Sequence, residues 1–407
     1  MNNSRKLNMS KKIKILVLFI ITFLFLFFMA FLLLGRNYDG KSYFTNLLQK
    51  ADIRVNGDRP WDIKIHNEKL FDRVLSQGSL GLGEAYMEGW WDCDSLDQFF
   101  YKILDANLDT KIGLDWITLC HIVKTKLINY QSKARSLEVA EQHYDLDNNL
   151  FELMLDPHMQ YSCGYWNNCD NLETAQEQKL DLICKKLYLK PGMKVLDIGC
   201  GWGGLARFAA QKYGVTVIGI TISKEQAKYA QNFCKDLPVT IRLQDYRDLN
   251  ESFDRIVSVG MFEHVGVKNY LELMKIVRAC LKKDGLFLLH TIGTNISTTS
   301  FDPWLHKYIF PNGQLPSVKQ ISQAAEGLFI LEDWHNFGIN YDKTLMAWHD
   351  KFNDNWDTLK LKYDNQFYRK WKYYLLSCAG LFRARHTQLW QIVFSRDGVK
   401  GGYISVR

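Results

Sequence analysis

The sequence lacks the cysteine patterns that cross-link small domains or bind zinc. Its nine cysteines are scattered along the chain, and no two of them form a C-x-x-C pair. Neither a zinc site nor a disulfide framework is therefore indicated, and we expect no metal. An odd, scattered set of thiols instead fits a reducing cytosol.

The chain also lacks a strong excess of one charge, an internal repeat and, after residue 36, any low-complexity run. The formal net charge is +7 over 407 residues. This value is too small to indicate a nucleic-acid partner, although it is compatible with an anionic membrane surface. With 47% hydrophobic and 23% charged residues, the composition predicts a globular protein with more than one domain.

One hydrophobic run stands apart at the N-terminus. Residues 15–34, ILVLFIITFLFLFFMAFLLL, contain Thr22 as their one polar side chain. Their number matches the hydrocarbon thickness of a bilayer, and each central Leu, Ile, Phe or Val favours insertion by roughly 0.3 to 0.6 kcal/mol. A cleaved signal peptide is the alternative, but the run is too long for one and lacks a small-x-small exit. We expect residues 1–36 to be an anchor segment.

The orientation of this anchor stays open, because basic residues flank it on both sides. Five precede the run and five follow it: Arg5, Lys6, Lys11, Lys12, Lys14, Arg36, Lys41, Lys50, Arg54 and Arg59. The first five would hold the N-terminus inside and place the remaining chain outside. A misassigned start codon is a further explanation, since residues 1–36 contribute to no motif described below.

Between the anchor and the first nucleotide-binding motif we expect two parts. Residues 37–125 form an N-terminal domain with the glycine-punctuated stretch LSQGSLGLGEAYMEGWWDCDSLDQFF. Residues 126–145 form a linker helix. The basic side chains in and just before this helix make it a candidate for facing a membrane, and a solvated connecting helix is the alternative.

From residue 189 onward, predicted strands and helices alternate. This pattern predicts an α/β domain over residues 146–407, with a doubly wound, mostly parallel sheet of the Rossmann type. The expected strands are residues 194–200, 215–221, 239–245, 253–260, 285–293, 329–338 and 389–396, the last of them antiparallel. We expect the first helix to end on Gly214, and Ser223 to begin the second with a capping box that Gln226 completes.

The loop VLDIGCGWGGL (residues 195–205) fits two ligand classes. Gly199-x-Gly201-x-x-Gly204 has dinucleotide spacing, whereas Asp197-x-Gly199-x-Gly201-x-Gly203 has the spacing of folds that bind S-adenosylmethionine. The glycines do not decide, because both classes bring the backbone close to a ligand at a helix N-terminus.

Neighbouring charges favour S-adenosylmethionine over a nicotinamide. A carboxylate at Asp197 would repel a pyrophosphate but suits the ammonium of a methionine moiety. The second strand ends in Thr221-Ile222-Ser223, without the acid that a dinucleotide ribose requires. After the third strand, Asp245 and Tyr246 lie where they can contact the amino group and the ring face of an adenine.

A second set of polar residues falls at the strand ends: Tyr161, Ser162, Cys163, Glu263, His264, His290 and Tyr341. Any one of them alone is more simply a structural polar residue. Gathered around one nucleotide loop, they are candidates for a reaction site. The surrounding aromatic residues suit a cationic methyl donor and an apolar acceptor, or they belong to the core.

The chain resembles the bacterial cyclopropane-fatty-acyl-phospholipid synthases from about residue 54 to its end. The motifs are SLGLGEAYMEGWWDCD, EQHYDLDNNLF, LDPHMQYSCGYW, LDIGCGWGGL, SVGMFEHVG, LLHTIG, KYIFPNG, EDWHNFG, LMAWH and CAGLFRAR. The resemblance implies transfer of a methylene from S-adenosylmethionine to the cis double bond of an unsaturated acyl chain in a membrane phospholipid, forming a cyclopropane ring. The alternatives are acyl-lipid methyl transfer without ring closure, a membrane-anchored binding protein and a nicotinamide oxidoreductase.

The resemblance also implies the residues of the site. Methyl attack leaves a carbocation, and a bicarbonate taken as the family's base removes the proton whose loss closes the ring. The matching bicarbonate residues are Cys163, Glu263, His290, Ile292 and Tyr341. The matching cofactor residues are Tyr161, Ser162, Gly199, Gly201, Gly203, Thr221, Ser223, Gln226, Asp245 and Tyr246. We expect Glu263 to orient bicarbonate, with a shared proton or an imidazolium at His290 relieving the repulsion, and Tyr341 to donate a hydrogen bond.

Cys378 matches the cysteine that the family gives as its active-site residue. Because a neutral thiol is mostly protonated near neutrality, we expect it to line the acyl pocket rather than attack. Arg383 and Arg385 are candidates for phosphate headgroups, with helix-surface charge as the simpler alternative. The resemblance further implies a homodimer built through the N-terminal domain. We expect the enzyme at the cytoplasmic face of the inner membrane, anchored by residues 15–34.

Overall fold

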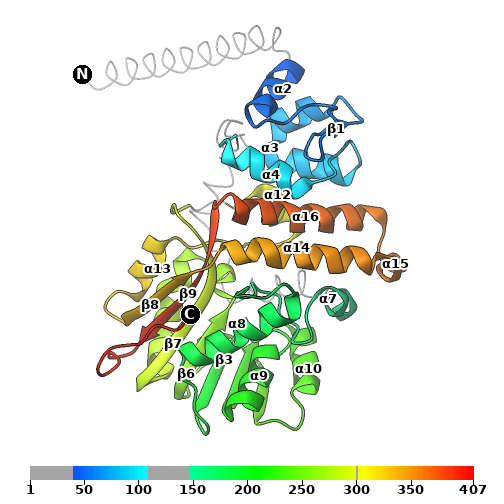
Figure 1. Ribbon diagram of the computed structural model, residues 1–407. Helices are drawn as coiled ribbons and strands as arrows, with labels where there is room; N and C mark the ends of the chain where they lie inside the picture. The colour runs from blue at the N-terminus through cyan, green and yellow to red at the C-terminus, as the bar shows by residue number, and fades with distance from the viewer. Residues whose placement is uncertain (1–39, 109–146, 299–300) are drawn as a thin grey trace, which may run out of the picture. The chain divides into compact units, whose positions relative to one another are not determined.

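Short runs rich in branched aliphatic residues build the central sheet of the computed structural model (Figure 1). Its strands are β3 (Lys194–Ile198), β4 (Thr216–Thr221), β5 (Val239–Leu243), β6 (Phe253–Val259), β7 (Leu281–Thr294), β8 (Ile330–Asn336) and β9 (Thr387–Ser395). They lie in the order β5-β4-β3-β6-β7-β9-β8. The first five are parallel, and β9 is antiparallel to both of its neighbours. The predicted α/β fold, with its mostly parallel sheet and antiparallel last strand, is confirmed.

The structure describes residues 40–108, 147–298 and 301–407. The predicted anchor segment and linker helix lie outside these ranges. Within the ranges, no helix combines the length and the apolar character needed to cross a bilayer.

Alternating side chains of the strands pack into two separate hydrophobic cores, one on each face of the sheet. Leu196 and Ile198 of β3 pack on the face covered by α11 (Tyr270–Cys280) and α13 (Val318–Ala325). Val195 packs on the opposite face, against α8 (Leu172–Lys186) and α9 (Gly204–Tyr213). Asp197 lies on this second face as well, among the side chains of α8 and α9. Because successive side chains of a strand point to opposite faces, the first strand thus aims a carboxylate at α8.

Caps end the helices near the glycine loop much as the sequence predicts. Gly214 ends α9 in the left-handed conformation, with a φ of 64°. Ser223 begins α10 (Lys224–Phe233), and its Oγ accepts the backbone N–H of Gln226 at 3.3 Å. The second half of the predicted capping box is wrong, because the Gln226 Oε1 accepts the Thr221 hydroxyl at 3.1 Å. The Gln226 side chain is thereby drawn toward the end of β4.

The chain divides into two units, residues 1–47 and 48–407. Helix α2 (Gly40–Lys50) contains the described part of the first unit. The second unit begins with β1 (Lys64–Ile65), α3 (Leu70–Met87), β2 (Trp91–Asp92) and α4 (Leu96–Asp105). Its other elements are α7 (Asn148–Met154), η1 (Tyr246–Asp248), η2 (Phe262–His264), η3 (Val267–Asn269), α12 (Pro303–Tyr308), α14 (Ile339–Asp354), α15 (Trp356–Leu359) and α16 (Asn365–Arg383).

Helices α14 and α16 lie side by side, and an arginine joins them to α4 (Figure 1). The Arg383 guanidinium donates to both Asp342 oxygens at 2.9 Å and to Asp97 Oδ2 at 2.7 Å. Arg385 donates to the Gln388 amide oxygen at 2.8 Å. Arg383 is therefore paired with two protein carboxylates, and its expected headgroup contact stays a prediction, as does that of Arg385.

Candidate active site

A cavity of about 180 Å³ opens at the carboxyl ends of β3, β4, β5 and β6. The turn between β3 and α9 forms its floor, with Gly199 at φ 82° and Gly201 at φ 53°. These left-handed conformations favour glycine. A Cβ at Gly199 would also lie 2.7 Å from the Met261 Cβ. The loop is thus shaped to let a ligand approach its backbone.

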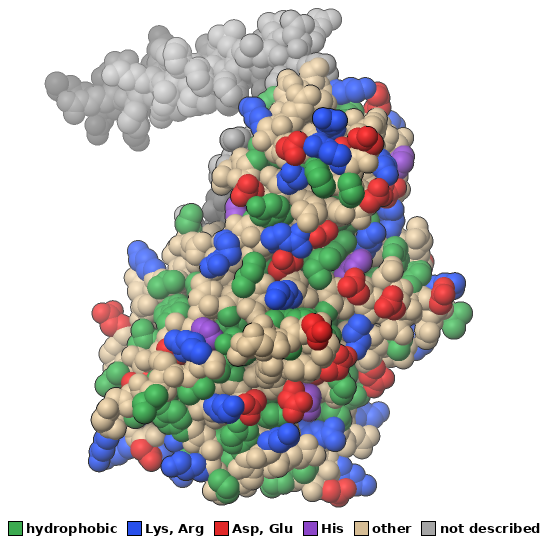
Figure 2. All heavy atoms as spheres, viewed as in Figure 1, with side chains coloured by type: hydrophobic (Ala, Val, Ile, Leu, Met, Phe, Trp, Pro, Cys, Tyr) green, Lys and Arg blue, Asp and Glu red, His purple; other side chains and the backbone are tan. Residues whose placement is uncertain are grey.

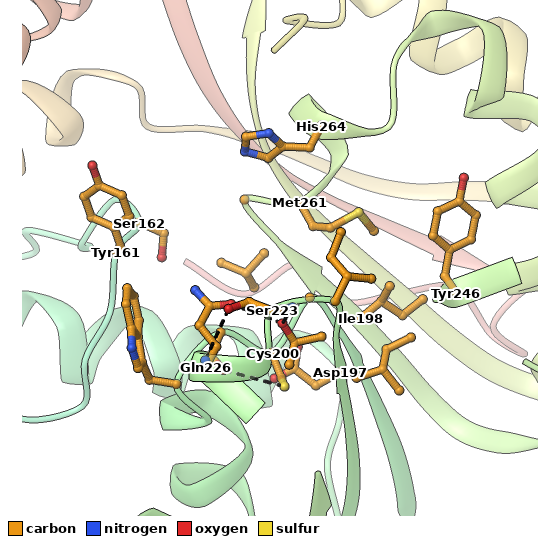
Figure 3. Close-up of a pocket in the computed structure, with 18 of the residues that line it drawn as sticks. Tyr161, Ser162, Asp197, Ile198, Cys200, Ser223, Gln226, Tyr246, Met261 and His264 are labelled. Atoms are coloured by element: carbon orange, nitrogen blue, oxygen red, sulfur yellow. Dashed lines mark hydrogen bonds between the residues drawn. The ribbon is translucent and has the colours of Figure 1, made fainter. Parts of the chain in front are cut away.

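All of the predicted cofactor residues except Gly203 line this cavity. Figure 3 shows Tyr161 and Ser162 at one side, Tyr246 at the other, and Ser223 and Gln226 between them. Gly203 instead caps α9, where its φ of 85° requires a glycine. His264, which the sequence groups with Glu263, also lines the cavity. Burial lowers its pKa to about 4, so its imidazole is neutral.

Asp197 places a buried carboxyl in the cavity wall. Burial raises its pKa to about 7, against a smaller lowering by the charge of Lys179. Its Oδ2 has no hydrogen-bond partner in the described ranges. A carboxyl of this kind ionises readily once a cation is brought to it. On the opposite side, the Arg247 guanidinium lies 3.0 Å from Asp245 Oδ2 and 4.5 Å from the centre of the Tyr246 ring.

A second cluster gathers where β6 and β7 end. The Glu263 Oε1 accepts the backbone N–H of Ile292 at 2.6 Å, and the Gly260 N–H donates to the His290 carbonyl at 2.9 Å. Ile292 therefore acts at this site by holding Glu263. Two polar atoms in the cluster, Glu263 Oε2 and His290 Nε2, are buried and have no partner among the described residues.

Two residues from other elements complete this cluster. Cys163 is fully buried, and its Sγ lies 4.0 Å from the Thr344 hydroxyl of α14. Tyr341 stands one turn earlier on the same helix. Burial raises the pKa of Tyr341 well above its ordinary value, and the neighbouring Cys163 and Glu263 raise it further. Burial likewise raises the pKa of Cys163. Both groups are neutral donors at physiological pH.

The electrostatics decide between the two ways of relieving repulsion at Glu263. Burial raises the pKa of Glu263 to about 7, so its carboxyl holds a proton in part of the molecules at neutral pH. Burial, together with the charges of Lys179 and Lys186, lowers the pKa of His290 well below its ordinary value. The imidazole of His290 is therefore neutral at physiological pH, which favours the shared proton at Glu263 over the imidazolium.

Cys378 lies on α16, where burial raises the pKa of its thiol to about 12. A thiol with this pKa is not ionised near neutrality, so nucleophilic attack is disfavoured. Cys163 and Cys378 both lie close enough to Tyr341 to raise its pKa further, so Cys378 stands near the second cluster. This location agrees with a lining residue.

Sequence reasoning missed several residues of the site. Gln160 and Met261 line the cavity, and Gln391 Nε2 lies 3.2 Å from His290 Nδ1. Lys179 is also missing from the predicted set, although it is fully buried beneath the cavity. No local signal marks these residues, because a lysine on an amphipathic helix is normally solvent-exposed.

Comparison with known proteins decides the family. The model of the mycolic acid cyclopropane synthetase family matches residues 131–392. Over 356 residues, the chain is 57% identical to the cyclopropane-fatty-acyl-phospholipid synthase of Escherichia coli, covering 88% of this chain and 93% of that protein. The chain belongs to the cyclopropane synthase family. The resemblance drawn from its motifs is confirmed.

Solved structures agree with this assignment. A cyclopropane synthase from Mycobacterium tuberculosis is 33% identical, with a TM-score of 0.60 over 63% of this chain and 97% of that one. A mycolic acid cyclopropane synthase, solved with SAH and CTAB, is 32% identical with the same TM-score and the same coverage. Membership makes this chain an S-adenosylmethionine-dependent enzyme of the methyltransferase class.

Proposed function

We propose that the enzyme transfers a methylene from S-adenosylmethionine to the cis double bond of an unsaturated acyl chain in a membrane phospholipid. The observation that carries this proposal is a donor-type cavity next to a cluster in which two buried polar atoms have no partner among the described residues. The name of the Escherichia coli relative supports the acyl-phospholipid substrate and the ring product.

In this proposal the cavity holds the donor along its length. Asp197 pairs with the methionine ammonium, since it is a buried carboxyl whose Oδ2 has no partner in the described chain. The side chains of Thr221, Ser223 and Gln226 meet the ribose, and Asp245 with Tyr246 meets the adenine. Tyr161 and Ser162 close the other side, toward the reacting methyl group.

The second cluster fits a small oxyanion. An anion in a buried site needs hydrogen-bond donors, and a bare carboxylate beside it would repel it. His290 is neutral, and its Nε2 has no partner in the part of the chain that the structure describes. Tyr341 keeps its phenolic proton, and Glu263 can hold a proton near neutrality. Bicarbonate would supply the base when bound to these residues.

Ring closure then needs several residues of the chain, each with its own role. The acyl double bond takes the methyl carbon, the bond from that carbon to sulfur breaks, and a cation is left on the chain. Glu263, held by the Ile292 N–H, keeps the anion beside the added carbon. Loss of one proton from that carbon lets its electron pair form the second ring bond. The apolar surroundings, with Cys378 un-ionised, keep water and thiolate away from the cation.

The proposed function also implies where the enzyme acts in the cell. We propose a phospholipid bilayer as the partner, the cytoplasmic face of the inner membrane as the location and residues 15–34 as the anchor, with a homodimer built through the N-terminal domain. The domain limits 1–36, 37–125, 126–145 and 146–407 are proposed with them. Protease access to the α/β domain in intact cells tests the orientation, because an enzyme on the inner face is protected.

A product assay tests the function directly. Purified enzyme, S-adenosylmethionine with a labelled methyl group and vesicles of an unsaturated phosphatidylethanolamine should give acyl chains heavier by one methylene unit, with ring protons in the NMR spectrum. Vesicles with saturated chains are the matched control. Depleting bicarbonate should slow the reaction, and adding it back should restore the rate. Methyl-branched products without ring protons would favour the alternative transferase.

Binding of the donor should be linked to a proton at Asp197. Because burial raises its pKa to about 7, the free enzyme carries a neutral carboxyl in most molecules at pH 6. Pairing with the donor ammonium requires the ionised form, so binding at pH 6 should release up to about one proton. Calorimetry in two buffers of different ionisation enthalpy measures this number. Asp197→Asn should abolish the release and weaken binding by about 2 kcal/mol or more; a release that persists in the variant would contradict the pairing.

A further inference from the structure

Lys179 is a buried charge that the proposed reaction does not use. It lies on α8, it is fully buried, and no carboxylate stands within 4 Å of its ammonium in the described ranges. Burial lowers its pKa to about 8. A lysine in such a place costs stability, because its charge is removed from water without an ion-pair partner. Its position therefore needs an explanation beyond the fold.

The Lys179 ammonium donates hydrogen bonds to two side chains of one loop. Its Nζ donates to the Gln160 amide oxygen at 2.5 Å and to the Ser162 hydroxyl at 2.9 Å. Both acceptors line the donor cavity, and Figure 3 shows Ser162 beside Tyr161 at its edge. Lys179 thus contacts two cavity-lining residues, Gln160 and Ser162, from the protein interior.

Contacts from Asp156 and Gln176 hold the same loop at its other points. The Asp156 carboxylate accepts the N–H groups of His158 and Gln160 at 2.8 and 2.9 Å. The Gln176 amide of α8 donates to the Ser162 carbonyl at 2.8 Å. These bonds fix the backbone of the loop. The Gln160 side chain has a second contact, because its Nε2 donates to the His158 carbonyl at 3.0 Å. Within the described residues, the hydrogen bond of the Ser162 hydroxyl is the one from Lys179.

We infer that Lys179 is a positioning residue, which orients the Gln160 and Ser162 side chains so that the cavity is preformed for S-adenosylmethionine. Ser162 has a single hydroxyl proton, and accepting from Lys179 leaves that proton free to point into the cavity. The inference rests on the proposed placement of the donor in this cavity. It adds a residue that sets donor affinity without touching the donor.

A matched pair of lysines tests this inference. Lys186 is also fully buried and lies on the same helix, two turns further on. Its Nζ is 2.9 Å from the Nδ1 of His335, and it has no bond to the loop in the described structure. Its Nζ also lies 4.0 Å from the Asp333 Oδ2, which Arg407 contacts as well. Lys179→Met and Lys186→Met each remove a fully buried lysine from α8, and within the described residues the first alone removes a contact with the loop. Calorimetry with SAH at 10 °C, with folding checked by circular dichroism, gives the Kd of each.

We expect Lys179→Met to raise the Kd by tenfold or more, Lys179→Gln by less, and Lys186→Met by no more than twofold. A purely structural role would lower the melting temperature of both Met variants and leave the Kd of the folded protein unchanged. That result would overturn the inference. An equal change of Kd in the two Met variants would overturn it too, as would a Lys186→Met protein that folds when Lys179→Met does not. The binding assay needs no lipid, so a wild-type enzyme that binds SAH but makes no ring product would refute the proposed function without affecting this test.

Discussion

Glu263→Gln should lower the rate of ring formation by about 10³-fold while leaving donor binding within threefold of the wild type. The variant keeps an amide oxygen that can accept from Ile292, so the local backbone is retained. It can no longer share a proton with an anion or carry a negative charge beside the cation. The measurement is the initial rate of labelled methylene incorporation, with the Kd for SAH from calorimetry alongside it.

Glu326→Gln is the matched control for this change. Glu326 is exposed at the end of α13, so its neutralisation should leave the rate unchanged. A Glu263→Gln enzyme that kept more than a tenth of the wild-type rate would show that the carboxyl is not needed near the reacting carbon. A loss of SAH binding in this variant would assign Glu263 to the donor site instead.

The same substitution should stabilise the protein at alkaline pH. The pKa of Glu263 is raised from 4.5 to about 7, so between these values the folded state holds more protons than the unfolded state. Stability then falls as the pH rises through this window, by up to about 3 kcal/mol. Glutamine cannot ionise, so the melting temperature of Glu263→Gln relative to the wild type should be higher at pH 8 than at pH 5.

Gly204→Ala should disrupt the donor site more than any other single methyl group added to the glycine loop. Gly204 begins α9, and a Cβ there would lie 1.8 Å from the His158 carbonyl oxygen and 2.4 Å from the Gln160 Nε2. Relief requires the loop from Asp156 to Ser162 to move away from the helix. We expect a stability loss of about 3 kcal/mol and an increase of at least tenfold in the Kd for SAH.

Gly192→Ala separates this steric effect from backbone strain. Gly192 has a φ of 83° but open space around its Cβ direction, so alanine should cost about 1 kcal/mol and leave the Kd unchanged. Thermal unfolding and calorimetry on both variants provide the comparison. If Gly204→Ala bound SAH as tightly as Gly192→Ala does, the close approach of the loop to α9 would not shape the donor site.

Much of the α/β domain could be predicted because its signals are local. The first strand was expected at residues 194–200 and is found at Lys194–Ile198, and α9 ends on Gly214 as predicted. Branched residues, glycines and capping side chains act on their own few neighbours, so their effects can be read along the chain. The capping box failed at Gln226 for the opposite reason, since its side chain found a partner at the end of a strand.

Charge states and pairings could not be predicted in this way. On the surface shown in Figure 2, lysines, arginines and acidic residues are interspersed, as the sequence alone would suggest for all of them. Yet Lys179 is fully buried, and Arg383 joins α4 to α14 across more than 200 residues of sequence. Both outcomes depend on which surface covers a given helix face, and that surface comes from distant segments.

The sequence by itself determined the family, the glycine loop and the set of polar residues at the strand ends, because these are recorded in contiguous motifs and in backbone preferences. The tertiary structure alone decided which of those groups are charged. Glu263 and Asp197 have pKa values near 7, and His290 is neutral, because burial penalises an ion according to everything that surrounds it. Desolvation is a property of the packed molecule, and no stretch of the chain carries it.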